Sequence, residues 1–161
     1  AANVYFENVG GRLENASEGS GLDVVSNSRS AAYLDFDGDG RLDIIVNDYY
    51  GPARLFHNRG ESAEGWLGLR LVGAPERGVN RDAIGARVIA RAGDLQVFRE
   101  VRGSEGYMSV HPKTLHFGVA DQQRVDLEIR WPNGRVQKVQ GLAAGTVHTL
   151  TYPAETETTA P

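Results

Sequence analysis

Apolar and polar residues alternate along most of the chain with a period of two residues. The alternation is clearest in Val125–Ile129 and Val147–Leu150, and it recurs in Leu95–Phe98. Such alternation is typical of strands that bury one face. No run of apolar residues at helical spacing extends beyond about two turns. The pattern therefore predicts an all-β chain.

Short segments rich in Gly, Asp, Asn and Pro separate the expected strands and mark turns. Examples are Asp37–Gly40, Asn58–Gly60 and Pro132–Gly134. Trp131 directly precedes the last of these turns. We expect its large apolar ring to lie in the core or to form a lid over it.

The chain divides into regions of different character. Residues 1–62 are rich in Asn, Asp and Gly, and they contain two similar motifs, Val4–Asn8 and Arg54–Asn58. A spacing of about 50 residues between such motifs is that of one β-propeller blade. Residues 63–153 contain a denser series of expected strands. Residues 154–161 contain no apolar anchor, and we expect them to be disordered.

The composition excludes several classes of protein. The 161 residues include no Cys, so a disulfide scaffold and a thiolate zinc site are excluded. With 17 basic and 21 acidic residues, the chain has no excess of positive charge for binding nucleic acid. No segment approaches the roughly 18 apolar residues of a membrane span. The chain begins at Ala1 without a Met, so we expect a processed protein or a part of a longer one.

The clearest chemical signal is the segment Asp35–Asp43, in which acidic residues alternate with other residues. Ca²⁺ takes six to eight oxygen ligands, and carboxylates at alternate positions of a tight loop can converge on one point. Gly40 permits the left-handed turn that such a loop needs. The expected ligands are the carboxylates of Asp35, Asp37, Asp39 and Asp43 and the main-chain carbonyl of Arg41.

This loop shares only the first half of its spacing with an EF-hand. The twelfth loop position is Val46 rather than Glu, and both flanks are strand-like, so we expect the loop at the tip of a β-hairpin. The alternative is an ordinary solvated turn. Four carboxylates within nine residues repel one another, which favours a bound cation, and a flexible acidic loop suits Ca²⁺ better than Mg²⁺. We expect a structural ion rather than a catalytic one.

The motifs also resemble known families. Residues 3–60 resemble an FG-GAP/VCBS-type repeat, the calcium-binding propeller blade of integrin-α-like proteins, through the two similar motifs and the Asp35–Asp43 loop. Residues 66–152 resemble the ASPIC/UnbV domain that follows such repeats in the cartilage acidic protein family. The stretches that carry this second resemblance are Trp66–Leu71, Asn80–Val88, Gly106–Ser109, Leu115–Gly118 and Ile129–Gly134.

The resemblance implies an exported protein that is secreted, periplasmic or held at the cell surface, and that serves in adhesion or matrix contacts. It implies one propeller-blade-like calcium hairpin followed by an antiparallel β-sandwich or barrel-like domain, with Ca²⁺ on the five ligands named above. A propeller needs at least about four blades. We therefore expect further blades upstream or a partner chain, and a protein or glycan ligand.

A second candidate site would form if residues 103–109 folded back toward the loop around residue 80. It consists of Arg81, Asp82, Glu105, Tyr107 and His116. The alternative is structural, with Asn80–Ala86 held by its own hydrogen bonds and His116 bonded within a strand. Because no nucleophile elbow, phosphate-binding loop or zinc-protease motif is present, we expect a binding module without catalysis. The alternative function is an exported enzyme acting on a carbohydrate or a secondary metabolite, with its pocket in the ASPIC/UnbV-like domain.

Overall fold

The computed structural model describes residues 2–60 and 65–154, and this part of the chain consists of strands, turns and one short 3₁₀ helix. The all-β prediction is confirmed. A helix with the length and hydropathy of a membrane span is absent from the described residues. Residues 61–64 lie outside the described residues, as does all but Ala154 of the expected disordered tail, residues 154–161.

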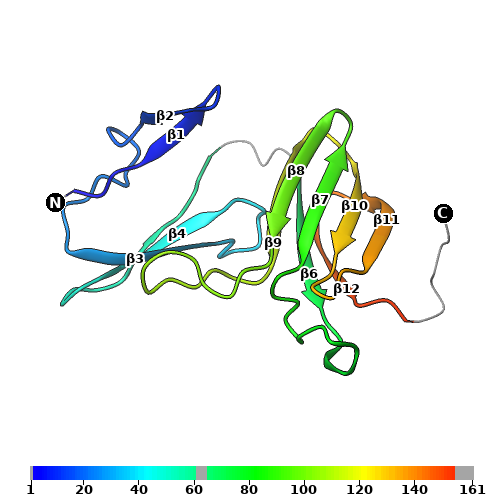
Figure 1. Ribbon diagram of the computed structural model, residues 1–161. Coiled ribbons are helices and arrows are strands. Elements are labelled where there is room, and N and C mark those ends of the chain that lie inside the picture. The colour runs from blue at the N-terminus through cyan, green and yellow to red at the C-terminus, as the bar shows by residue number, and fades with distance from the viewer. Residues whose placement is uncertain (1, 61–64, 155–161) are drawn as a thin grey trace. The chain divides into compact units, whose positions relative to one another are not determined.

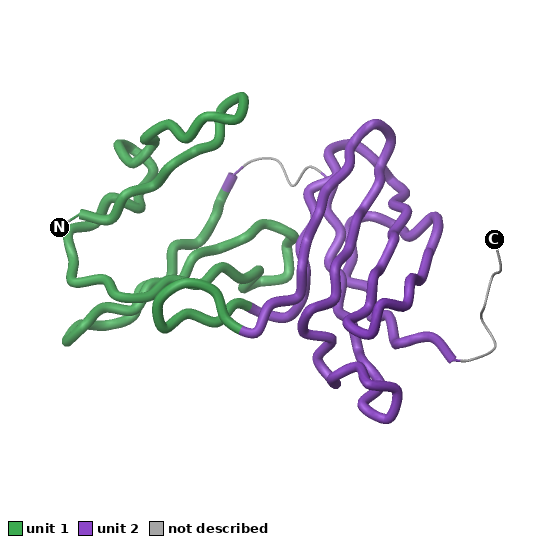
Figure 2. Tube along the Cα trace, in the orientation of Figure 1, with its two compact units in different colours: residues 1–59, 104–111 green, residues 60–103, 112–161 purple. Residues whose placement is uncertain are grey.

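The chain forms two compact units, which Figure 2 colours separately. Unit 1 contains residues 1–59 and 104–111, and unit 2 contains residues 60–103 and 112–161. The chain thus leaves unit 2 after Gly103, contributes a short segment to unit 1, and returns to unit 2 at Pro112. The expected division into domains 1–62 and 63–153 stays a prediction.

Unit 1 contains a β-hairpin and a three-stranded antiparallel sheet with the order β3-β4-β5 (Figure 1). Its strands are β1 (Phe6–Val9), β2 (Arg12–Asn15), β3 (Ser28–Leu34), β4 (Asp43–Asp48) and β5 (Arg54–Phe56). Leu34 pairs with Asp43 in the register of β3 and β4. The acidic loop therefore connects two antiparallel strands, as the sequence predicts.

Side chains from the segment 104–111 cover the outer edge of β3. The backbone N–H of Ala31 donates to Ser109 Oγ at 3.3 Å, and that of Tyr33 donates to His111 Nδ1 at 3.2 Å. The imidazole also stacks on the Tyr33 ring, with 4.0 Å between the ring centroids. An open strand edge invites pairing with other chains, so these contacts protect β3 from such pairing.

Unit 2 contains two sheets, with the orders β11-β10-β7-β8 and β12-β6-β9. Its elements are β6 (Gly65–Val72), a 3₁₀ helix (Pro75–Arg77), β7 (Arg87–Ala92), β8 (Leu95–Glu100), β9 (Leu115–Ala120), β10 (Arg124–Arg130), β11 (Val136–Ala143) and β12 (Thr146–Thr151). The strands pair antiparallel except β6 and β12, which pair parallel. Arg99 Nε on β8 donates to the carbonyl of His116 on β9 at 3.1 Å, which joins the two sheets along one edge.

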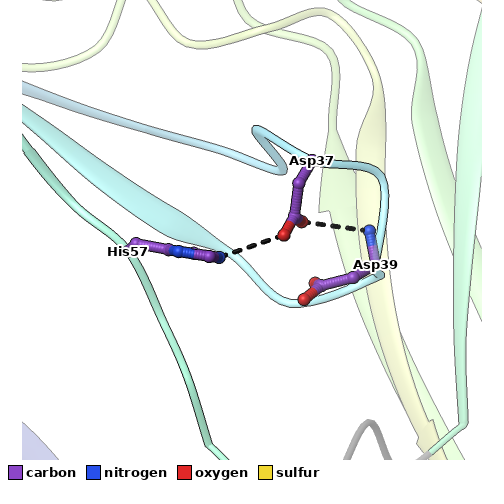
Figure 3. Close-up of side chains that lie close together, drawn as sticks. All are labelled: Asp37, Asp39 and His57. Atoms are coloured by element: carbon purple, nitrogen blue, oxygen red, sulfur yellow. Dashed lines mark hydrogen bonds and ion pairs between the residues drawn. The ribbon is translucent and has the colours of Figure 1, made fainter.

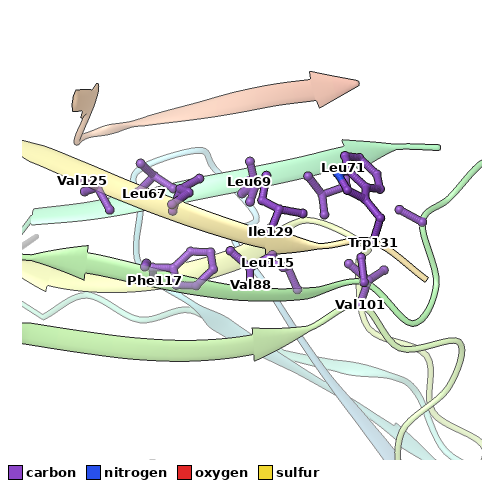
Figure 4. Close-up of a cluster of buried hydrophobic side chains, with 14 of the residues drawn as sticks. Leu67, Leu69, Leu71, Val88, Val101, Leu115, Phe117, Val125, Ile129 and Trp131 are labelled. Carbon is purple, nitrogen blue, oxygen red and sulfur yellow. The ribbon is translucent and has the colours of Figure 1, made fainter. Parts of the chain in front are cut away.

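The hydrophobic core of unit 2 consists of inward-facing side chains of these strands and of a few residues between the strands (Figure 4). Strand β10 buries Val125 and Ile129, as its alternating pattern predicts, and β9 buries Phe117. Trp131 is also buried, and its indole N–H donates to Gln137 Oε1 at 3.1 Å. The prediction that Trp131 lies in the core is confirmed. The described part of unit 2 is therefore a sandwich-like domain with a continuous core.

Candidate functional site

The acidic loop between β3 and β4 is folded by hydrogen bonds from its own backbone. Asp35 accepts the N–H of Gly38 at 2.8 Å and the N–H of Gly40 at 3.0 Å, one on each carboxylate oxygen. Asp39 Oδ1 accepts the N–H of Arg41 at 2.8 Å. Gly38 and Gly40 have φ angles of +79° and +88°, a left-handed conformation that glycine adopts without strain. These hydrogen bonds and the two glycines bend the segment into a tight loop.

Asp43 is the buried base of the loop, with only 1% of its surface exposed. Its Oδ2 accepts the N–H of Phe36 at 2.8 Å, and its Oδ1 accepts the N–H of Asn58 at 2.7 Å. A buried carboxylate must be hydrogen-bonded or paired with a positive charge, because burial alone disfavours its charge. Asp43 therefore ties both ends of the site together, the start of the loop and the segment that follows β5.

Asp37 lies between a ring nitrogen and a backbone amide (Figure 3). His57 Nε2 is 3.0 Å from Asp37 Oδ2, and the backbone N–H of Asp39 donates to Asp37 Oδ1 at 3.3 Å. Desolvation raises the pKa of the Asp37 carboxyl, but the hydrogen bonds from Asp39 and His57 and the charge of His57 outweigh it and lower the pKa. The carboxylate is therefore held in its charged form, which is the form that binds a cation.

The carboxylates of the loop are close enough to share one ion. One oxygen from each of Asp35, Asp37 and Asp43 lies within 4.8 Å of the others. Oxygens on opposite sides of a calcium ion lie about 5 Å apart, because each is roughly 2.3–2.6 Å from the metal. The spacing and the all-oxygen chemistry of these three donors fit Ca²⁺.

The remaining expected ligands, Asp39 and Arg41, have other partners as well. Asp39 forms a second group of closely spaced donors with Asp37 and His57. The guanidinium of Arg41 bonds the Asp39 carboxylate, and its Nε donates to the carbonyl of Asn58 at 3.0 Å. Coordination through the main-chain carbonyl of Arg41 stays a prediction, as does that of the four aspartates.

His57 is a member of the site that the sequence reasoning missed. It directly follows Phe56, which pairs with Ile44 in the register of β4 and β5. That register places residue 57 beside Asp43, at the base of the acidic loop. The repeated motif Arg54–Asn58 contains this histidine. The motif indicates a place near the acidic loop only when it is paired with β4, the strand that follows the loop.

Two of the five residues of the second candidate site line a cavity of unit 1. Glu105 and Tyr107 face this cavity of about 670 Å³ together with Tyr33 and His111. His111 Nε2 lies 4.0 Å from Glu105 Oε2, while its Nδ1 accepts the backbone N–H of Tyr33. The imidazole therefore holds β3 in place through one nitrogen and faces Glu105 through the other.

The other three residues of that candidate site belong to unit 2. Arg81 Nε pairs with the neighbouring Asp82 at 3.2 Å. Asn80 exchanges two hydrogen bonds with the backbone of Ile84, at 2.8 and 2.9 Å, and so closes the loop around them. His116 stacks parallel to Trp66, with 5.9 Å between the ring centroids. The five residues are thus divided between the two units, and binding by them stays a prediction.

Comparison with known proteins identifies the second half of the chain. The sequence profile described as ASPIC and UnbV matches residues 76–157, which is just over half of the chain. The chain belongs to the ASPIC and UnbV family. It is also 26% identical to Cartilage acidic protein 1 of Xenopus tropicalis and of Homo sapiens, each over 91% of this chain. It spans less than a quarter of the length of these relatives.

The match confirms the ASPIC/UnbV part of the predicted resemblance, whereas the FG-GAP/VCBS repeat in residues 3–60 stays a prediction. The residues that match the ASPIC/UnbV family include strands β7 to β12 of unit 2. They also include the segment 104–111, which packs in unit 1. The family sequence therefore contributes Ser109 and His111 to the cover of β3.

Proposed function

We propose that the chain is part of an extracellular binding or adhesion protein and that Ca²⁺ bound at Asp35–Asp43 stabilises it. The observation that carries this proposal is the convergence of three carboxylate oxygens, from Asp35, Asp37 and Asp43, within 4.8 Å of one another. Extracellular fluid is rich in calcium, so a loop of this type would be filled there. The similarity to Cartilage acidic protein 1 supports the same setting.

The proposed role of the ion is structural. Aspartates 35, 37, 39 and 43 place four negative charges in one hairpin loop, and a divalent cation offsets their repulsion. The bound ion would hold the loop against the segment after β5, where Asp43 already accepts the N–H of Asn58. Loss of the ion would loosen this end of the three-stranded sheet.

We further propose that unit 1 is an FG-GAP/VCBS-type repeat that packs against further propeller blades or a partner chain. Strands β1 and β2 bury none of their residues, and their apolar side chains are exposed, including Phe6 and Leu13, the latter by 71%. Clustered exposed apolar side chains mark a contact surface. The relatives have more than three quarters of their length outside the matched region, which is room for such blades.

A calcium titration of the thermal unfolding temperature tests the proposal. Extracellular modules bind calcium at about 10⁻⁴–10⁻³ M, and an ion at 100 times its dissociation constant stabilises the folded state by about 2.7 kcal/mol. We expect the unfolding temperature to rise with Ca²⁺, to rise less with Mg²⁺, and to return to its starting value with a chelator.

Substitutions of the loop aspartates test whether the calcium-dependent rise in unfolding temperature comes from this loop. Asp37→Asn and Asp39→Asn are expected to weaken the calcium response. Glu14→Gln, which removes one exposed negative charge from β2, is the matched control and is expected to retain the response. Full calcium affinity in both aspartate variants would refute the ligand assignment.

A second candidate function is an exported enzyme that acts on a carbohydrate or a secondary metabolite. The cavity lined by Glu105, Tyr107 and Tyr33 supports it, because aromatic walls with a few polar groups are typical of small-molecule sites. His111 uses Nδ1 as an acceptor for a backbone N–H, which favours a binding role over general-base catalysis. Chemical turnover in a screen of glycans and small metabolites, lost in Tyr107→Ala, distinguishes this function from the first, whereas binding without turnover fits the first.

A further inference from the structure

The acidic loop is held from outside by the two residues that follow β5. The N–H of Asn58 donates to Asp43, and the carbonyl of Asn58 accepts Arg41 Nε. Pairing of Phe56 with Ile44 fixes the backbone on the other side of His57. The backbone of His57 is thus fixed by ladder pairing before it and by two hydrogen bonds after it, so its imidazole has a defined place beside the loop.

The imidazole of His57 contacts one carboxylate oxygen of Asp37, and the other oxygen accepts a hydrogen bond from the loop backbone. Nε2 lies 3.0 Å from Oδ2, whereas Oδ1 accepts the N–H of Asp39 (Figure 3). Both side chains are about one third exposed, and an exposed ion pair of this kind contributes little to stability. The contact therefore matters more for the direction of the carboxylate than for the free energy of unfolding.

We propose that His57 is a positioning residue of the calcium site: by donating a hydrogen bond to one oxygen of Asp37, it turns the carboxylate so that Asp37 binds the ion in a fixed orientation. The inference rests on the calcium function proposed above. Carboxylates that ligate metals are commonly held by a hydrogen bond from an outer residue, and loss of such a partner typically weakens metal binding 10–100-fold. Ca²⁺ prefers oxygen ligands, so the imidazole itself stays outside the ligand set.

The decisive experiment compares His57→Ala with His57→Gln by calcium titration calorimetry of the full chain, with all proteins at the same pH. The Gln side chain can place an amide N–H near the position of Nε2, and Ala cannot donate. We expect His57→Ala to weaken calcium binding about 10-fold and His57→Gln to stay within about threefold of the unsubstituted chain.

A structural role is separated by the unfolding temperature in excess chelator, which we expect to be the same for all three proteins. His148→Ala is the matched control for loss of an imidazole, because His148 lies in unit 2 and its Nε2 donates to the carbonyl of Ala143 in the same unit at 2.8 Å. We expect it to leave calcium affinity unchanged.

Each of the alternative results refutes a different part of the inference. Equal or tighter binding by His57→Ala would refute the role of His57 and leave the calcium site standing. Equal losses in the Ala and Gln variants, or a lower unfolding temperature of His57→Ala in chelator, would show that hydrogen-bond donation to Asp37 is not the cause. Absence of binding by the unsubstituted chain would refute the calcium site itself, and the role of His57 with it.

Discussion

Substitution of Asp43 is expected to destabilise the β3–β4 hairpin even in the complete absence of calcium. The carboxylate is almost fully buried and accepts two backbone N–H groups, those of Phe36 and Asn58. Hydrogen bonds to a charged group contribute about 1.5–3 kcal/mol each, so the two together contribute about 3–6 kcal/mol. Asp43→Ala removes both, and burial prevents water from replacing them fully.

Amide hydrogen exchange in excess chelator measures this loss at the site itself. The free energy of opening for amides between Phe36 and Asn58 should fall by about 3 kcal/mol or more in Asp43→Ala. Asp43→Asn keeps one acceptor oxygen but turns an N–H₂ group toward a backbone donor, so we expect roughly half to all of that loss. Asp39→Ala is the comparison, because Asp39 is about one quarter exposed and accepts one backbone N–H.

Two results would refute this reasoning. Unchanged protection in Asp43→Ala would mean that the two hydrogen bonds contribute nothing net to the hairpin. A loss that appears only when calcium is present would mean that Asp43 acts through the ion alone. A loss in chelator that is clearly larger for Asp43→Ala than for Asp39→Ala is the expected outcome.

Two further predictions concern each unit separately. In unit 1, burial raises the pKa of Asp48, but hydrogen bonds from Ser28 and Arg54 outweigh it and lower the pKa. The charged carboxylate therefore stabilises the folded state above its ordinary pKa of 3.8, and this stabilisation is lost as the pH falls through the lowered value. Asp48→Asn should thus destabilise at pH 7 and lose its effect in acid, and equal destabilisation at both pH values in urea unfolding would contradict this. In unit 2, Phe117→Ala should cost about 3–5 kcal/mol by urea unfolding followed through tryptophan fluorescence, since both tryptophans lie in that unit. Phe98→Ala, on the exposed face of β8, is the control and should cost far less.

The sequence was most informative where local chemistry decides the structure. The alternation in Val125–Ile129 predicted a strand with one buried face, and β10 buries those residues. The spacing of the aspartates predicted a hairpin loop, and Asp43 indeed pairs with Leu34 at its end. The two-residue alternation and the turn-forming residues each depend on only a few neighbouring residues. Both can therefore be recognised in a single sequence.

The contacts that the sequence did not reveal join distant parts of the chain. His57 lies 20 residues from Asp37, and only the register of β4 with β5 brings them together. The parallel pairing of β6 with β12 joins the first and last strands of unit 2, and alternation is the same for parallel and antiparallel neighbours. Tertiary register, rather than periodicity, sets these contacts.

Residues 104–111 belong to unit 1, although the sequence around them belongs to unit 2, and this limits how either unit can be recombined with a foreign domain. A chimaera that joins residues 1–60 to a foreign domain would lose Ser109 and His111, and the N–H groups of Ala31 and Tyr33 would lose their acceptors. The exposed β3 edge would then be open to pairing with another molecule, which is a route to aggregation. A recombinant protein would therefore keep unit 1 intact only if it also carried the ASPIC/UnbV sequence. We expect the two parts of the sequence to be inherited together.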